Sequence, residues 1–209
     1  MNPTDLLVFL PLIFLDTWAC VLLLVDQLFL RERRGITALL AALGLLGSLG
    51  LIVFRTILIS TGRIEGGLYF RAFNGMVVVD GFATFLSVLF AISGLAGVAL
   101  AYDYLRRMGL NRGEYYPLLL FSVGGMTLMS MAADLIIVFL AMELLSIPLY
   151  VLSGFARPRL DSEEAALKYF LLGAFSTGLI VYGVALVFGA AATTQLMGIV
   201  AAIHANAVQ

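Results

Sequence analysis

The chain has 209 residues, of which 62% are hydrophobic and only 12% are Asp, Glu, Lys or Arg. A soluble domain of this length needs more polar surface, so the composition excludes a soluble protein and predicts an all-α polytopic membrane protein. One cysteine and one histidine exclude an iron–sulfur or structural zinc site built from this chain alone, and no basic cluster suits a nucleic-acid partner.

Six hydrophobic runs predict six transmembrane helices within a single transmembrane domain, residues 1–209. At a rise of about 1.5 Å per residue, about 20 residues cross the hydrocarbon core of a bilayer. The predicted spans are 6–30, 35–55, 82–102, 117–133, 135–156 and 164–191. Residues 193–209 follow them, and their pattern predicts a short amphipathic segment at the membrane surface.

The first span contains two acids, Asp16 and Asp26. Counting back from Arg31 at about 1.5 Å per residue puts Asp16 roughly 22 Å from the basic end, deep in the membrane. Asp16 is therefore a candidate for proton transfer, although an acid that faces a neighbouring helix or subunit explains it equally well. Asp26 lies nearer the end of the span, where it can reach the interface.

The second span has no charge before Arg55, which we expect to extend toward the interface. Between the second and third spans, Asn74-Gly75 separates the apolar segments 68–70 and 76–79. This dipeptide between apolar segments is the strongest short-range hairpin signal, so we predict a small β-hairpin at the membrane surface. Asp80 is expected to cap the third helix.

The loops between the spans differ in positive charge. The arginines on one side are Arg31, Arg33, Arg34, Arg106, Arg107, Arg112, Arg157 and Arg159. The loops on the other side contain only Arg63 and Arg71. Because cytoplasmic loops carry an excess of basic residues, this asymmetry predicts that both termini lie outside.

The fifth span, 135–156, has a single ionisable side chain, Glu143, near its middle. A charged residue at that depth costs roughly 2.5 kcal/mol or more and is by default a functional candidate. The alternative is a protonated or hydrogen-bonded glutamate that only holds helices together. Pro148 lacks an N–H, so the carbonyl of Leu144 is left free beside the carboxyl group.

The sixth span begins with the acidic segment 161–164 and carries Lys168, the only lysine of the chain. Lys168 lies about 6 to 9 Å inside the helix and Glu143 about 20 Å from the same face, so the two are not expected to touch. Asp26 lies at a depth similar to that of Lys168, which suggests the hypothesis that Asp26 neutralises Lys168. An equally good alternative is that Lys168 extends to the cytoplasmic interface.

A resemblance to a known family rests on two segments. The longer one is MELLSIPLYVLSGFARPRLDSEEAALKYFLLGAFSTGLIVYGVALVFGAAATTQL, and the shorter is VVVDGFATF before the third span. The first resembles the fifth and sixth helices of subunit N, also called subunit 2, of the proton-pumping NADH:quinone oxidoreductase, respiratory complex I. The second is similar to the same family.

The resemblance implies that Glu143 and Lys168 are the glutamate of the fifth helix and the lysine of the sixth, both implicated in moving protons. It implies a membrane-arm subunit that contributes to proton translocation, driven by electron transfer in other subunits. The chain itself would have no cofactor, and NADH, FMN, iron–sulfur clusters and quinone are expected in partner subunits. The partners would be other complex I membrane subunits, especially antiporter-like and small ones, in a bacterial plasma membrane.

Two alternatives remain open at this point. The chain could be a component of a multisubunit cation/proton antiporter without redox partners. It could also be a structural scaffold of the membrane arm without a complete proton path. Subunit N normally has further lysine-bearing helices and a broken helix in each repeat, and these 209 residues do not contain them. We expect the chain to correspond to the N-terminal part of subunit N.

Overall fold

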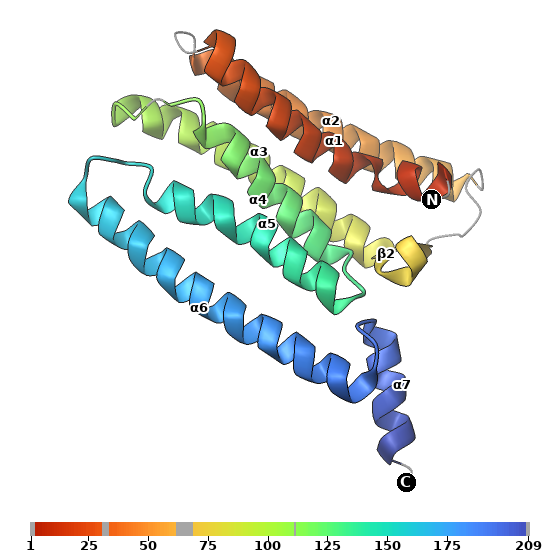
Figure 1. Ribbon diagram of the computed structural model, residues 1–209. Coiled ribbons are helices and arrows are strands. Elements are labelled where there is room, and N and C mark those ends of the chain that lie inside the picture. The colour runs from red at the N-terminus through yellow and green to blue at the C-terminus, as the bar shows by residue number, and fades with distance from the viewer. Residues whose placement is uncertain (1–2, 31–33, 62–68, 111, 208–209) are drawn as a thin grey trace.

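The computed structural model describes residues 3–30, 34–61, 69–110 and 112–207, and most of them are helical. Helices α1 to α6 lie side by side and alternate in direction, and α7 turns away from α6 (Figure 1). The helices are α1 (Pro3–Val25), which continues into a π-helical turn (Asp26–Leu30), α2 (Arg34–Ser60), α3 (Gly81–Arg107), α4 (Tyr115–Ser130), α5 (Leu135–Ser153), α6 (Leu160–Ala191) and α7 (Leu196–Ala207). The predicted all-α class is confirmed.

Five helices in the described part of the chain are long and apolar enough to cross a membrane, namely α1, α2, α3, α5 and α6. The fourth predicted span corresponds to α4, which has 16 residues and is about 24 Å long. That length is less than the roughly 30 Å of a hydrocarbon core. Six spans and two outside termini therefore stay predictions.

Several helices extend beyond the predicted spans, because polar residues continue a helix outside its apolar run. At its C-terminal end α3 continues to Arg107, which forms an ion pair with Asp103 one turn earlier. At its N-terminal end α6 begins at Leu160, so Asp161 and Glu163 occupy its first turn. Acidic side chains there interact favourably with the positive end of the helix dipole.

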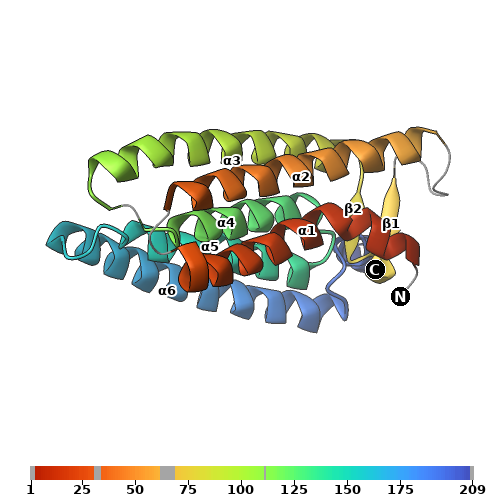
Figure 2. The same ribbon diagram turned by 90° about the horizontal axis from the view of Figure 1, so that it is seen from above.

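Helix α4 is the centre of the bundle, with α1, α3 and α5 packed against it. The main core is formed by side chains from α1 to α4, among them Leu15, Leu45, Leu120 and Val123, all almost fully buried. By contrast, α6 lies along one edge of the bundle, packs mainly against α5 and has no buried residue (Figure 2).

The predicted β-hairpin is confirmed. Strands β1 (Phe70–Ala72) and β2 (Val77–Val79) pair antiparallel, with Phe70 opposite Val79. Phe73 and Asn74 have φ angles of 52° and 57°, in the left-handed region where asparagine is enriched. Residues 62–68, including Leu68 of the predicted hairpin, lie outside the described residues.

The hairpin joins two turns at one end of the bundle. The N–H of Val78 donates to the carbonyl of Met131 at 2.8 Å, which fixes β2 to the turn between α4 and α5. The N–H of Leu196 donates to the carbonyl of Ala133 at 3.0 Å, which fixes the start of α7 to the same turn. Three loops that are distant in sequence therefore form one backbone network.

Asp134 is the side chain that completes this network, and it is 1% exposed. Its Oδ1 accepts a hydrogen bond from the N–H of Ile136 at 2.8 Å and so caps α5. Its Oδ2 accepts a hydrogen bond from the hydroxyl of Thr194 at 2.7 Å. A buried carboxylate without these donors would be costly. Asp134 therefore has a structural role.

We expect Asp134→Ala to lower the free energy of unfolding by about 1 to 3 kcal/mol, because it removes a helix cap and leaves two part-buried donors without their acceptor. Thermal unfolding of the protein in detergent measures the change. Asp103→Ala, which removes only the exposed ion pair with Arg107, is the control and should leave the unfolding temperature unchanged. Equal losses in both variants would contradict the buried role of Asp134.

Arg55 does not extend to the interface, and the expectation that it does is wrong. Its side chain is 3% exposed and turns into the bundle. Its Nη1 donates to the carbonyl of Val8 at 3.0 Å, and its Nη2 donates to the hydroxyl of Thr84 at 3.2 Å. These acceptors on α1 and α3 replace water for Nη1 and Nη2, while Nε is buried without a hydrogen-bond partner among the described residues.

Candidate functional site

Glu143 lies on the face of α5 that packs against α6 and is half-buried there. Its Oε1 accepts a hydrogen bond from the hydroxyl of Thr177, on α6, at 2.7 Å. The carboxyl group is thus held between two helices by a neutral donor, with no ion pair among the described residues. Such a group can gain or lose a proton without breaking a salt bridge.

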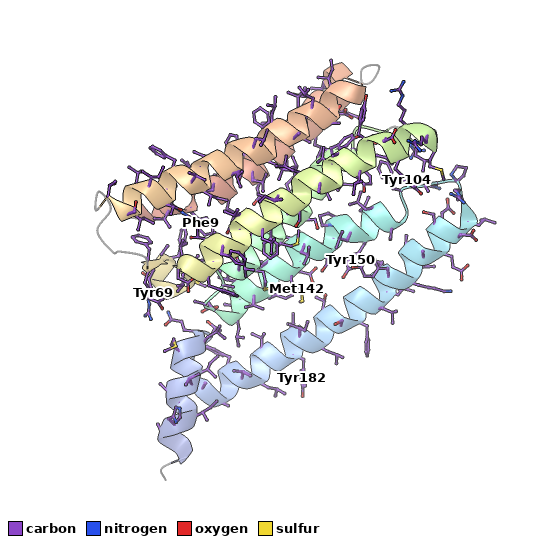
Figure 3. All side chains as sticks on the ribbon, turned by 180° about the vertical axis from the view of Figure 1, so that it is seen from behind. Phe9, Tyr69, Tyr104, Met142, Tyr150 and Tyr182 are labelled. Atoms are coloured by element: carbon purple, nitrogen blue, oxygen red, sulfur yellow. The ribbon has the colours of Figure 1, made fainter. Side chains whose placement is uncertain are left out.

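Aromatic packing on one side of this pair sets how α5 and α6 meet. Tyr150, two turns after Glu143, lies edge-on to Tyr169 at 4.8 Å and to Phe170 at 5.9 Å between ring centroids (Figure 3). A Cβ at Gly173 would overlap the Tyr150 ring, so this glycine provides the space for it. Because Gly173 and Thr177 are four residues apart on one helix face, this contact brings Thr177 opposite Glu143.

Sequence reasoning did not identify Thr177. A single threonine in an apolar helix has no local feature that separates it from a threonine bonded to its own backbone. The available signal is the spacing of Gly173 and Thr177 on one helix face, which follows a run of aromatic residues.

Pro148 is buried inside α5, one turn after the Leu144–Leu145 peptide. Because proline has no N–H, the carbonyl of Leu144 lacks its usual helical donor. The same peptide packs against Gly125 of α4, where a Cβ would lie 2.7 Å from the Cα of Leu145 and 2.9 Å from the carbonyl carbon of Leu144. The backbone next to Glu143 is therefore in direct contact with α4.

Lys168 lies on the same helix as Thr177 but outside the contact with Glu143. It is exposed and forms an ion pair with Glu164, one turn earlier on α6. Nine residues separate it from Thr177, which is about 14 Å along the helix axis. Glu143 and Lys168 are thus not brought together, as their depths predicted.

The hypothesis that Asp26 neutralises Lys168 is wrong. Asp26 is 5% exposed, and its Oδ1 accepts the hydroxyl of Thr37 at 2.6 Å. A Cβ at Gly113 would overlap the Asp26 carboxyl group, so this acid is enclosed at its own end of the bundle. Figure 1 shows α1 and α6 on opposite sides of the bundle, with other helices between them. Depth alone could not reveal that separation.

Asp16 lies at the contact between α1 and α4, where its carboxyl group meets Gly124. Its Oδ1 is buried and has no hydrogen-bond partner within the described ranges. Gly124 directly precedes Gly125, the residue that packs against α5.

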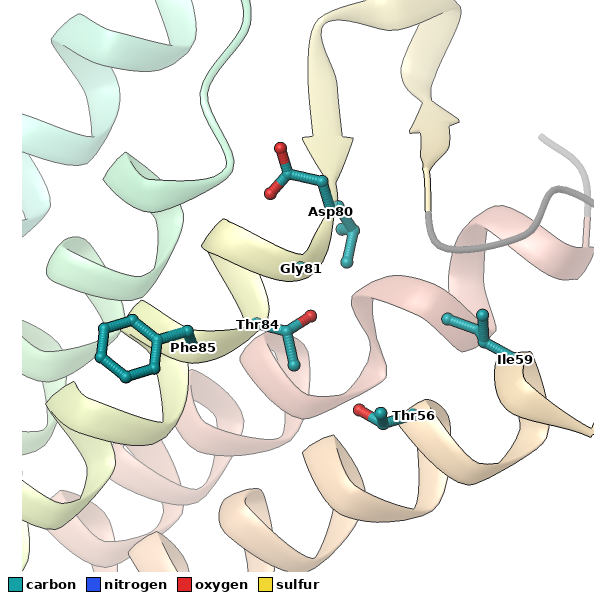
Figure 4. Close-up of a pocket in the computed structure, with 7 residues that line it drawn as sticks. Thr56, Ile59, Asp80, Gly81, Thr84 and Phe85 are labelled. Carbon is teal, nitrogen blue, oxygen red and sulfur yellow. The ribbon is translucent and has the colours of Figure 1, made fainter.

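A cavity of about 280 Å³ lies elsewhere, between the end of α2 and the start of α3 (Figure 4). Its lining includes Thr56, Thr84, Phe85 and Asp80. The Asp80 carboxylate accepts the N–H of Ala83 at 2.7 Å and caps α3, as predicted. Because Asp80 is occupied as a cap and no second acid or base lines this cavity, Glu143 is the better candidate for the site.

Within the described ranges, no group of three or more His, Cys, Asp or Glu side chains could hold a metal ion.

If Glu143 transfers protons, as the resemblance implies, Thr177→Val should lower the rate of that transfer about tenfold or more, because it removes the donor that orients the carboxyl group. A hydrogen bond to a charged group contributes about 1.5 to 3 kcal/mol. Proton movement in vesicles that contain the complete assembly measures the effect. Thr177→Ser keeps a hydroxyl group and should restore the rate, whereas equal rates in the valine and serine variants would contradict a positioning role.

The apolar helices and the acids between them define a multi-pass membrane protein. Residues 132–209 match the family model described as "NADH:quinone oxidoreductase/Mrp antiporter, TM". The chain is 45% identical over 197 residues to NADH-quinone oxidoreductase subunit N of Chloroflexus aggregans, covering 93% of this chain and 38% of that protein. It is 41% identical to subunit N 2 of Roseiflexus castenholzii, covering 94% and 38%. The predicted resemblance to subunit N is confirmed, and the chain spans about two fifths of the length of these curated relatives.

Solved structures agree with this relationship. Respiratory complex I from Thermus thermophilus with bound aureothin contains a chain that is 30% identical, with a TM-score of 0.70 over 89% of this chain and 38% of that one. The membrane-bound sulfane sulfur reductase, an archaeal respiratory membrane complex, contains a chain with a TM-score of 0.64 over 94% and 39%. At 21% identity, the second likeness shows the fold alone.

Proposed function

We propose that this chain is the N-terminal part of a membrane-arm subunit of a proton-pumping NADH:quinone oxidoreductase, and that Glu143 transfers protons there. The observation that carries the proposal is the Glu143 carboxyl group between α5 and α6, bonded at 2.7 Å to Thr177 and free of any salt bridge in the described residues. The 45% identity to a subunit N supports the assignment to this enzyme.

In this proposal the chain contributes no redox chemistry of its own. NADH oxidation, FMN, iron–sulfur clusters and quinone reduction belong to partner subunits, which drive the membrane arm. Moving a charge near a carboxyl group changes how tightly it holds a proton, so a conformational change elsewhere can load or empty Glu143. Its neighbours would be other antiporter-like and small membrane subunits.

Lys168 and Asp16 have different places in the proposed path. Lys168, paired with Glu164, can exchange protons with water at the basic end of the bundle. About 14 Å separates it from the level of Thr177, so water or residues of other helices must bridge the gap. Asp16 would be a further acid on the far side of α4.

The proposed orientation in a bacterial plasma membrane follows from charge. The N-terminal ends of α2, α4 and α6 and the C-terminal end of α3 lie together at one end of the bundle (Figure 1). The described basic residues of this end include Arg106, Arg107, Arg112, Arg157 and Arg159. The excess of basic residues in cytoplasmic loops favours this end on the cytoplasmic side, with both termini outside.

Affinity purification of the tagged protein from its native membranes tests the proposal. We expect flavin and iron–sulfur proteins to copurify and the preparation to oxidise NADH with quinone. Copurification with other hydrophobic subunits alone, without flavin or iron–sulfur proteins, would instead support a multisubunit cation/proton antiporter. If the chain is a scaffold without a proton path, it would copurify with redox subunits, but the proton transport of the complex would not respond to substitution of Glu143.

A further inference from the structure

Asp16 lies in the middle of α1, and its buried Oδ1 has no hydrogen-bond partner in the part of the chain that the structure describes. By contrast, the carboxyl group of Asp26, in the π-helical turn after α1, accepts a hydrogen bond from the Thr37 hydroxyl at 2.6 Å. The Asp16 carboxyl group faces α4 at Gly124, where a Cβ would overlap Oδ1 and lie 3.1 Å from Cγ. Any residue other than glycine at this position would displace the carboxyl group.

Among the described residues, no charged side chain forms an ion pair with Asp16. The charged or titratable residues on the described elements packed against α1 are Asp26, Arg34, Arg55, Arg71, Tyr115 and Tyr116. Arg55 donates to the carbonyl of Val8, eight residues from Asp16, which is about 12 Å along the helix. Asp26 is ten residues away, and Tyr116 is eight residues from Gly124. An ionised carboxyl group here would be partly buried within an apolar helix bundle and without a paired charge, which is unfavourable, so the neutral acid is the favoured form.

Two adjacent glycines connect this acid to the site at Glu143. Gly124 receives the Asp16 carboxyl group from α1, and Gly125 receives the Leu144–Leu145 peptide of α5, directly after Glu143. These contacts place the two acids at similar levels on either side of α4. Helix α4 has no side chain at these two contact positions, and the backbone of α5 lies between Gly125 and the Glu143 carboxyl group, which faces α6.

We propose that Asp16 is a second proton-binding site, held as a neutral carboxylic acid against Gly124, at the level of Glu143 on the opposite side of α4. Its part in translocation rests on the function proposed above. The existence of the site depends only on the contact between α1 and α4.

Labelling with dicyclohexylcarbodiimide in native membranes tests the site separately from its function. The reagent takes the acid proton on one of its nitrogens, and the carboxylate oxygen then bonds to its central carbon, so it selects protonated carboxyl groups in apolar surroundings. Mass spectrometry of the α1 peptide should find the label on Asp16 and not on Asp26, and Asp16→Asn should abolish it. No label on Asp16 would overturn the proposal, and protection by excess sodium ions would overturn it in favour of a sodium site.

Substitution of the glycine provides a second readout. Gly124→Ala adds a methyl group where the carboxyl oxygen lies, so the labelling of Asp16 should change several-fold even in an assembled complex. Gly50→Ala on α2, where no atom lies within 4 Å of the added Cβ, is the matched control and should leave labelling unchanged. Equal labelling in both variants would overturn the contact.

Proton transport then tests the role of the site. In the complete complex, Asp16→Asn should lower the number of protons moved per electron while NADH oxidation continues. Labelled Asp16 with an unchanged ratio in Asp16→Asn would overturn Asp16 as a carrier and leave Glu143 unaffected. Failure of the function proposed for Glu143 would appear independently, as unchanged transport in Glu143→Gln.

Discussion

Glu143→Gln is expected to remove the proposed proton path through α5 and α6 while the complex still assembles. Glutamine has nearly the same size and still accepts the hydroxyl of Thr177, which is 2.7 Å from Oε1. It cannot take up or release a proton near neutral pH. A positioned acid–base group contributes about 100-fold or more to a proton transfer, so flow along this path should become negligible. The measurement is the ratio of protons moved to electrons transferred, in vesicles that contain the purified complex.

The control for this variant is another glutamate of the same chain. Glu163 forms an exposed ion pair with Arg157 at 3.0 Å, near the start of α6 and 14 residues before Thr177. Glu163→Gln makes the same chemical change without touching the proposed path, so its ratio should equal that of the unmodified complex. An unchanged ratio in Glu143→Gln, in a complex that oxidises NADH normally, would contradict a proton-carrying role for Glu143.

The features that could be predicted from the sequence are local ones. Long apolar runs indicate membrane helices, and Asn74-Gly75 between apolar segments indicates a hairpin, because both signals depend only on neighbouring residues. Glu143 was identifiable because it is the single acid of an otherwise apolar run. The length of α4 was less predictable. The apolar run continues to Ala133, but α4 ends at Ser130, and the backbone of the following residues forms hydrogen bonds with the hairpin and the start of α7.

The contacts of the polar side chains could not be predicted, because they depend on rotation about the helix axis and on which helices are neighbours. The position of Arg55 near the end of an apolar run suggested the interface, yet its helix face turns it toward Val8 and Thr84. The depth of Asp26 suggested Lys168, whereas the packing of α2 against α1 and the π-helical turn brings Thr37 to Asp26. Depth follows from counting residues, but the partner follows from packing.

Gly125→Ala is expected to destabilise the protein, because α4 and α5 touch through their backbones at this position. The added Cβ would overlap the backbone nitrogen of Leu145 and lie 2.7 Å from its Cα, and a backbone cannot rotate away as a side chain can. Overpacking of this kind costs about 1 to 3 kcal/mol. The Leu144–Leu145 peptide would have to move, and Glu143 with it. We expect a lower unfolding temperature and a smaller fraction of assembled complex, measured by thermal unfolding in detergent and by native electrophoresis.

Gly178→Ala on α6 is the matched control, and its expected effect has the opposite sign. No atom lies within 4 Å of a Cβ at Gly178, so this substitution creates no overlap. Alanine stabilises a helix interior relative to glycine by roughly 0.5 to 1 kcal/mol, and the unfolding temperature should therefore stay the same or rise. If Gly125→Ala were as stable as Gly178→Ala, the two helices could not be in backbone contact. The proposed connection between Asp16 and Glu143 through the adjacent glycines of α4 would then lose its structural basis.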